Sequence, residues 1–204
     1  MCLLVERGMR VGGSQRPSTI NKGINQYWES DMSLSFYDCS VASFLQTLGG
    51  VKNAMERGAA TAADSALDLE ALVNFRLHED MLPFSFQVVS VWHHSLGAMK
   101  GLSAGLFEPP PKLGELSYSD LLGLVDEAIA YCAELEETTV NELGGRPMLF
   151  KMGKIELPFT TESFLLSFSL PNFYFHATTT YSMLRHHGVP LGKMDYLGSL
   201  RMTS

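Results

Sequence analysis

Five histidines stand where their spacing could support chemistry. The string LPNFYFHATTTYSMLRHHGVPLGKMDYLG contains His176, His186 and His187, and the string WHHS contains His93 and His94. Imidazoles on facing helices of a bundle are common ligands of zinc or iron, and a neutral imidazole can act as an acid or base near pH 7. These residues are therefore the first candidates for a functional site.

Helical geometry separates these histidines into two groups. His176 and His187 fall on one stripe of an ideal helix, but eleven residues of helix rise roughly 16 Å. Two imidazoles that far apart cannot share an ion, because ligand bonds are about 2 Å long. His186 and His187 are predicted instead to lie at the C-terminal end of the helix, where a donor or cation suits the free carbonyls.

The second helix supplies its own candidates. At 100° per residue, Gln87 and His94 share one edge of this helix beside its apolar stripe, whereas His93 is predicted to point roughly opposite the stripe. His94 and Gln87 are therefore the residues of this helix expected to approach His176. A hydrogen-bonded imidazole is the simplest role for His176, since buried polar groups need partners.

Apolar periodicity predicts the elements that position these residues. Apolar residues recur at steps of three and four in four long segments, which indicates four amphipathic helices. The string MLFKMGKIELPF alternates around a Gly-Lys turn and predicts a short hairpin. The sequence therefore predicts an all-α protein, an antiparallel four-helix bundle with a short β-hairpin before its last helix. The expected helices run from about Phe36 to Gly58, from just after Asp80 through Leu102, from the cap at Ser119 to the stop at Gly144, and from about Thr160 to His187.

Two local signals refine these elements. Ser119 is the expected N-cap of the third helix, with Asp120 in its first turn. Pro171 falls inside the last helix and lacks an amide donor, so it is expected to kink or divide that helix. Asn172 could then satisfy a carbonyl that the proline leaves free.

Composition excludes several classes of partner. The net charge is −7 and the basic residues are scattered, so nucleic acid is not an expected partner. No apolar run is long enough to span a bilayer, so no membrane insertion is expected. Three widely spaced cysteines give no disulfide framework, which favours a cytoplasmic protein. Residues 1–31 show no period and are predicted to form a disordered N-terminal extension, with the folded domain spanning 32–204.

Three strings carry a family resemblance: MSLSFYDCSV, RLHEDMLPFSFQV and the closing string that begins at Leu170. They resemble marker segments of DUF1993, an uncharacterised bacterial and fungal family, over roughly residues 32–198. That family is similar to the DinB-like helical bundles, a superfamily that includes thiol-dependent transferases and hydrolases. The resemblance implies a four-helix bundle, and it raises the prospect of a divalent metal held by histidines on two helices.

This chain departs from the metal-binding pattern that the resemblance implies. In DinB-like metal proteins the last helix carries two histidines one turn apart, and here His176 would be followed by Thr180. A hydroxyl is a poor substitute for imidazole at a transition-metal site. No cofactor is therefore predicted, and a divalent metal held by His94, His176 and a carboxylate such as Asp80 or Glu79 is kept as an alternative.

The favoured function is small-molecule binding in a pocket between helices near Pro171, with His176 as the candidate catalytic residue if there is a reaction. Whether the protein is an enzyme is left open. The alternatives are a metal-dependent DinB-like transferase or hydrolase and a non-catalytic oligomeric partner protein, such as a homodimer. The predicted ligand-binding residues are Gln87, Trp92, His94, Asn172, Tyr174, His176 and Tyr181.

Overall fold

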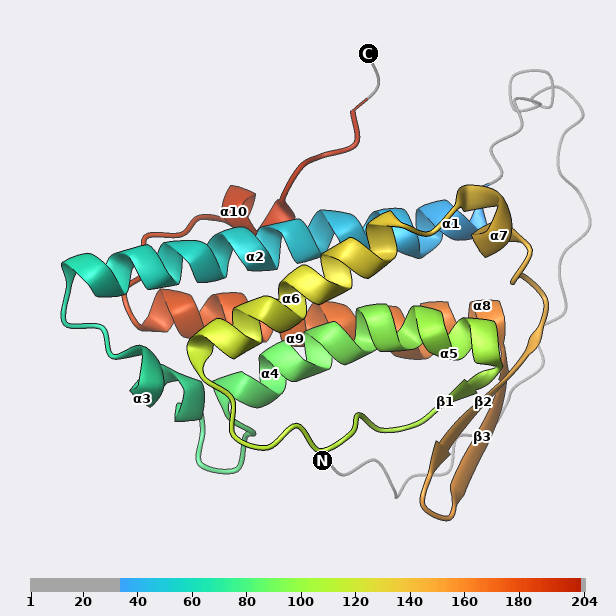
Figure 1. The fold of residues 1–204 in the computed structure, drawn as a ribbon, viewed down its shortest axis with the longest axis horizontal. Coiled ribbons are helices and arrows are strands. Elements are labelled where there is room, and N and C mark those ends of the chain that lie inside the picture. The colour runs from blue at the N-terminus through green and yellow to red at the C-terminus, as the bar shows by residue number, and fades with distance from the viewer. Residues whose placement is uncertain (1–33, 203–204) are drawn as a thin grey trace, which may run out of the picture. The chain divides into compact units, whose positions relative to one another are not determined.

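The computed structural model of the protein describes residues 34–202, and its centre is a four-helix bundle (Figure 1). The bundle helices are α2 (Val41–Asp64), α4 (Phe84–Trp92), α6 (Tyr118–Ala133) and α9 (Leu170–His186). Helices α2 and α4 each pack against both α6 and α9. The predicted fold class, a helical bundle with a small hairpin, is confirmed.

The direction of the helices follows from one long connection. After α4 and α5 (Ala98–Ala104), the chain forms β1 (Leu106–Phe107) and then runs back along the bundle before α6 begins (Figure 1). Helices α4 and α6 consequently run in the same direction, opposite to α2 and α9. The antiparallel neighbours are α2 with α6 and α4 with α9, and the second of these pairs carries the candidate site.

Short helices connect or extend the bundle helices. Two π-helical segments also occur, η1 (His93–Gly97) between α4 and α5, and η2 (Leu165–Ser169) directly before α9. The remaining short helices are α1 (Phe36–Cys39), α3 (Leu69–Asn74), α7 (Glu137–Asn141), α8 (Thr161–Phe164) and α10 (Lys193–Leu197).

Capping residues define where the helices begin. Helix α6 starts with Ser117 as its N-cap, and the Asp120 side chain accepts a hydrogen bond from the Ser117 amide at 2.9 Å. The prediction of Ser119 as this cap is wrong by two residues, because Ser117 rather than Ser119 completes the reciprocal pair with Asp120. The last helical segment starts after Thr160, as predicted, and Thr160 and Ser163 cap it reciprocally.

The predicted hairpin is confirmed as β2 (Pro147–Met152) and β3 (Ile155–Thr160), which pair antiparallel around Gly153. Gly153 has φ +61°, a conformation that glycine adopts at little cost. Strand β1 adds to β2 in a parallel arrangement that was not predicted. A strand of two residues has no readable period, so only its tertiary pairing reveals it.

The chain stays helical through Pro171, because η2 changes the hydrogen-bonding pattern just before it. The Leu170 amide bonds to the Leu165 carbonyl five residues back, and α9 begins at Leu170. The Asn172 side-chain amide donates to the Phe168 carbonyl at 2.7 Å. The expected interruption therefore takes the form of a π-helical segment, with Asn172 supplying a donor to the backbone near the proline.

The core joins all four bundle helices. Its largest fully buried side chains include Phe44, Phe84, Phe164 and Phe173, and the rings of Phe44 and Phe173 meet edge to face at 4.9 Å. Burying each such side chain stabilises the fold by about 1.5–3 kcal/mol. Within residues 34–202, every helix is too short or too polar to cross a lipid bilayer. The predicted disordered extension, residues 1–31, lies outside the described residues.

Candidate functional site

Gln87 on α4 and His176 on α9 form the centre of the candidate site. His176 Nδ1 lies 2.8 Å from Gln87 Oε1, and Gln87 Nε2 donates to the Leu82 carbonyl at 3.0 Å. Because the amide nitrogen of Gln87 is used by Leu82, its oxygen faces His176 and can only accept a hydrogen bond. Nδ1 of neutral His176 therefore carries the proton, and Nε2 carries the free lone pair.

His94 lies beside His176 and has an unpaired ring nitrogen. The two imidazoles are nearly parallel, with ring centroids 6.1 Å apart and an interplanar angle of 14°. Nδ1 of His94 is buried and has no hydrogen-bond partner among residues 34–202. Buried polar atoms without a partner are rare in folded proteins. The pair formed by His94 and His176, here called the imidazole pair, is therefore an incompletely satisfied polar cluster inside the bundle.

The two π-helical segments meet at this site. Ser169, the last residue of η2, donates its hydroxyl to the backbone carbonyl of His94 in η1 at 2.8 Å. A π-helical segment inserts an extra residue into a helical turn and is found frequently at functional sites. Ser169 thus ties the backbone of one segment to the other and helps to hold His94 next to α9.

His93 corrects one prediction from the sequence. It was expected to point away from the core, but its side chain is buried, stacks on Phe107 at 4.4 Å and hydrogen-bonds to the Glu108 carbonyl at 2.8 Å. The physical reason is tertiary, because Phe107 and Glu108 pack over the face of the helix that carries His93. Both neighbouring histidines consequently face protein.

Burial makes these imidazoles weak bases. It lowers the pKa of His93 to about 4 and that of His176 to about 4. It lowers the pKa of His94 to about 3, with smaller contributions from the neighbouring His93 and His176. All three rings are therefore neutral at pH 7, which leaves each with one donor and one acceptor nitrogen.

The residues present do not fit the divalent metal that the sequence resemblance implies. Thr180 uses its hydroxyl to donate to the His176 carbonyl at 2.9 Å. Asp80 is exposed and lies 2.6 Å from His78 Nδ1. Across the part of the chain that the structure describes, no group of three or more His, Cys, Asp or Glu side chains could hold a metal ion. Two imidazoles alone make an incomplete ligand set.

The other predicted site residues lie in different surroundings. Trp92 donates its indole N–H to Glu127 on α6 at 3.0 Å. Tyr181 packs against Tyr196 of α10, with ring centroids 5.8 Å apart. Of the predicted ligand-binding set, the structure thus brings together Gln87, His94 and His176, and the binding roles of all seven residues stay predictions.

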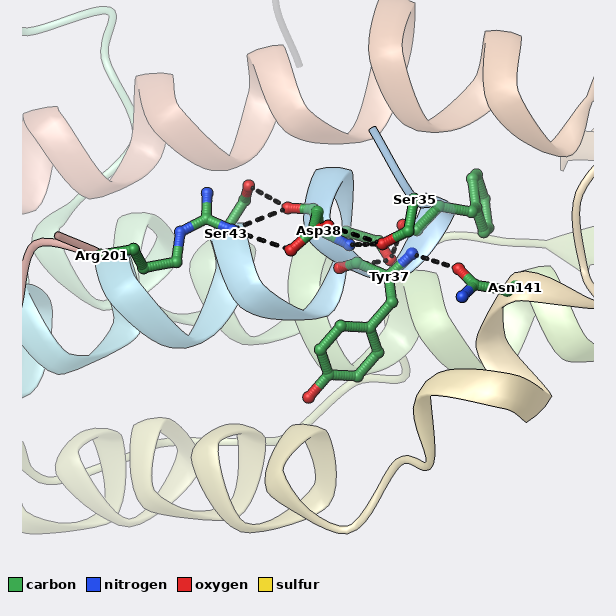
Figure 2. A network of polar contacts seen from close by, with 8 residues as sticks. Ser35, Tyr37, Asp38, Ser43, Asn141 and Arg201 are labelled. Atoms are coloured by element: carbon green, nitrogen blue, oxygen red, sulfur yellow. Dashed lines mark hydrogen bonds and ion pairs between the residues drawn. The ribbon is translucent and has the colours of Figure 1, made fainter. Parts of the chain in front are cut away.

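Tyr174 also faces away from the imidazole pair. Burial raises its pKa, and Ser43 and Arg201 lie close enough to oppose that rise. Ser43 and Arg201 belong to a polar network that also joins Asp38 and, through Tyr37, Asn141 (Figure 2). Arg201 Nη1 donates to the Asp38 carbonyl at 3.3 Å, so this network attaches the C-terminal segment to the first helices.

At the far end of α9, His186 and His187 pack on one aromatic ring. Phe75 stacks on His186 at 5.3 Å and meets His187 edge to face at 4.3 Å. Among the described residues, neither imidazole hydrogen-bonds to a carbonyl of the helix end, and Nε2 of His187 is buried without a partner. Their predicted capping role is thus replaced by packing.

Sequence reasoning did not single out three residues of the site. Phe86 and Phe175 meet the His176 ring edge to face, with centroids at 5.8 and 5.1 Å, and Ser169 holds the His94 backbone. Both phenylalanines remain partly exposed, at 37% and 58%. The one available signal was their position, since Phe175 adjoins His176 and Phe86 adjoins Gln87.

Comparisons with known proteins agree with this fold. The model of the family described as "Domain of unknown function (DUF1993)" matches residues 36–197. A crystal structure of a DinB family member protein from Shewanella denitrificans is similar in fold, with a TM-score of 0.69 and 24% sequence identity. That match covers 82% of this chain and 94% of the other. A search of curated proteins gave no significant match. The chain therefore belongs to the DUF1993 family and shares its fold with a DinB family member.

Proposed function

We propose that this protein binds a small molecule at the imidazole pair. The observation that carries the proposal is the buried, unpartnered Nδ1 of His94 beside His176. Leaving a buried polar atom unpaired costs about 1–3 kcal/mol. A ligand atom that hydrogen-bonds there would remove this cost in the complex, which gives the site a reason to bind.

The neighbours of the pair define the chemistry of the ligand. The hydrogen bond from His176 to Gln87 leaves Nε2 of His176 as an acceptor, so the ligand should offer an N–H or O–H group. The partly exposed rings of Phe86 and Phe175 flank His176 and suit a flat apolar group. A neutral, planar molecule with one hydrogen-bond donor fits both requirements.

Binding is favoured over proton transfer at this pair. An efficient general base has a pKa near the working pH, and burial lowers the pKa of His176 to about 4. At pH 7 its neutral ring accepts a hydrogen bond readily but holds an abstracted proton poorly. His176 is therefore proposed to orient the ligand.

The proposal is tested by following the ¹⁵N signals of the histidine ring nitrogens in labelled protein. Two-dimensional NMR at pH 7 should show His176 protonated on Nδ1, and indole should shift its ring signals. N-methylindole, which lacks the donor, should bind more weakly. His176→Phe should abolish indole binding, while His78→Phe, at an exposed position, should not. Equal binding of both probes, or indole binding that survives His176→Phe, would contradict the proposal.

Two alternatives predict different results. A DinB-like transferase or hydrolase should yield one divalent metal per chain in elemental analysis of untagged protein, lost in His94 and His176 variants. A non-catalytic partner protein should form a homodimer in light-scattering measurements and show reduced exposure of Phe86 and Phe175. Either result would replace small-molecule binding as the first hypothesis.

A further inference from the structure

A separate cavity of about 600 Å³ opens between α3, the first turns of α4 and the segment before α6. Neither His94 nor His176 lines it, so it is distinct from the imidazole pair. Its volume lies within the usual range of small-molecule sites. The cavity is lined by Glu70, Val73, Asn74, Ser85, Phe86, Val89, Pro111, Leu113, Gly114, Glu115, Leu116 and Ser117.

The charged residues of this cavity are all acidic. Glu70 projects from α3 and Glu115 from the segment before α6, and no lysine or arginine lines the cavity. Neither carboxylate forms an ion pair within residues 34–202. Lys112 belongs to the same segment as Glu115 but is not a lining residue. The fold thus brings two negative charges, 45 positions apart in sequence, to one cavity, and residues 34–202 form no ion pair with either of them.

The partial positive charge at the N-terminus of α4 does not make the cavity positive overall. Ser85 and Phe86 lie in its first turn, and Pro83 provides no side-chain cap. The N-terminus of a helix carries roughly half a positive charge that fades within one turn. Ser117, the N-cap of α6, also lines the cavity, so the two helix N-termini together contribute roughly one positive charge. The two carboxylates carry about twice that charge, so the cavity remains negative overall.

Apolar side chains also line the cavity, beside the polar residues Asn74, Ser85 and Ser117. Val73 is 5% exposed, whereas Phe86 presents 37% of its surface. Val89, Leu113 and Leu116 are partly buried against the core. An aromatic face attracts a cation, and this attraction adds to that of nearby carboxylates. The lining therefore combines a surface for an apolar group with negative charge and one accessible aromatic ring.

We propose that this cavity binds an organic cation, an amine attached to a compact apolar group. The ammonium lies toward Glu70 and Glu115, and the apolar group packs against Val73, Val89 and Phe86. The proposal is independent of small-molecule binding at the imidazole pair, although the ring of Phe86 contacts both places.

Three probes of nearly equal size test the class of ligand: 2-phenylethylamine, 2-phenylethanol and 3-phenylpropanoate. Amide chemical shifts of the full chain are followed by NMR at low ionic strength and pH 7. The amine should bind about fivefold more tightly than the alcohol, in line with the size of exposed charge pairs and cation–π contacts. Its largest shifts should fall in residues 70–74, 85–89 and 113–117. The propanoate should bind most weakly.

Variants assign the selectivity to the two carboxylates. Glu70→Gln combined with Glu115→Gln should reduce the ratio of amine to alcohol affinity to about one. The control is Glu142→Gln, which replaces the exposed C-cap residue of α7 at the other end of the bundle. It should leave the ratio unchanged. The imidazole-pair proposal is judged by indole binding and this inference by the ratio of amine to alcohol affinity, so their failures are distinguishable. Equal binding of amine and alcohol to the natural chain, no binding of any probe, or shifts centred elsewhere would overturn the inference.

Discussion

Two flanks of the bundle, one between α4 and α9 and the other between α2 and α10, hold polar side chains in opposite ways. Toward α4, His176 and His94 are neutral, and Nδ1 of His94 has no partner. Toward α10, Asp195 is paired with Arg57 Nη1 at 2.5 Å and accepts the Gly192 amide at 2.7 Å. The first flank retains a polar atom that the described residues do not satisfy, whereas the second uses its charges to fasten one segment to another.

The second flank is called here the C-terminal clasp, residues 192–201. Gln46 Nε2 donates to the Leu197 carbonyl at 3.1 Å, and Thr178 donates to the Tyr196 hydroxyl at 3.0 Å. Arg201 then reaches Asp38 (Figure 2). The difference teaches two things. Polar groups that are fully paired attach one segment of the chain to another, whereas the neutral imidazoles with an unpaired nitrogen mark the candidate binding site.

Lowering the pH should reduce the stability contributed by the first flank much more than that contributed by the second, and this is the largest difference we expect. The folded-state pKa values of His93, His94 and His176 lie below their unfolded value, so the unfolded chain binds more protons between about pH 4 and 6.5. Their stabilisation is complete above pH 6.5 and is lost as the pH falls toward 4. We expect the free energy of unfolding to fall by about 5–6 kcal/mol between pH 7 and pH 5, measured by urea denaturation.

The clasp should not contribute to this loss. The Gly192 amide, followed by Arg57 and Asn53, lowers the pKa of Asp195, so its stabilisation is lost only at pH values below the normal carboxylate range. Asp195→Asn should therefore show the same decrease between pH 7 and pH 5. A stability that is flat across this interval would show that the imidazoles are not buried in neutral form.

A single methyl group should break the clasp. A Cβ at Gly50 would overlap the Tyr196 carbonyl oxygen, which belongs to the backbone and cannot rotate away. Gly50→Ala should therefore displace α10 and lower the free energy of unfolding by about 3 kcal/mol. Gly49→Ala is the matched control, because a Cβ there meets nothing within 4 Å. It should stabilise α2 by about 0.5–1 kcal/mol. Equal effects of the two substitutions would argue against a docked clasp.

His176 variants sharpen the comparison on the other flank. His176→Leu leaves Gln87 Oε1 without its donor and should cost about 1–3 kcal/mol of unfolding free energy. His176→Gln keeps a donor and an acceptor and should largely preserve the fold. Thermal denaturation followed by circular dichroism measures both. If the glutamine and leucine variants are equally stable, the hydrogen bond to Gln87 contributes nothing and the assigned tautomer loses its basis.

The smallest effect is expected from removing residues 1–31. A chain that begins at Met32 retains every described contact, so its melting temperature should stay within about 2 °C of the full chain. Differential scanning calorimetry provides the measurement. A decrease of several degrees, or aggregation, would mean that the N-terminal residues dock on the bundle.

Much of the fold is readable from local signals. Apolar residues such as Phe44, Leu48 and Met55 recur at helical spacing, and all three are fully buried in α2. The Gly153 turn and the Thr160 cap also lie where the sequence predicts them. These signals succeed because period, turn and cap depend on residues a few positions apart.

The candidate site was predictable only in part. Gln87 and His94 were expected on one edge of α4 near His176, and they lie there. The inward position of His93 and the link from Ser169 to His94 were not expected. The first depends on Phe107 and Glu108, which pack over that face of the helix, and the second on the meeting of η1 and η2. A helical wheel shows the faces of one helix but not the distant segments that pack against them.

The sequence by itself therefore determined the helical bundle, its hairpin and the family, because those features repeat at short range along the chain. Only the tertiary structure decided which polar groups meet. It paired Asp195 with Arg57 across 138 positions and placed Glu70 and Glu115 in one cavity. It also left Nδ1 of His94 unpaired among the described residues. Such contacts follow from helix packing, which acts on residues far apart in sequence and leaves no local pattern.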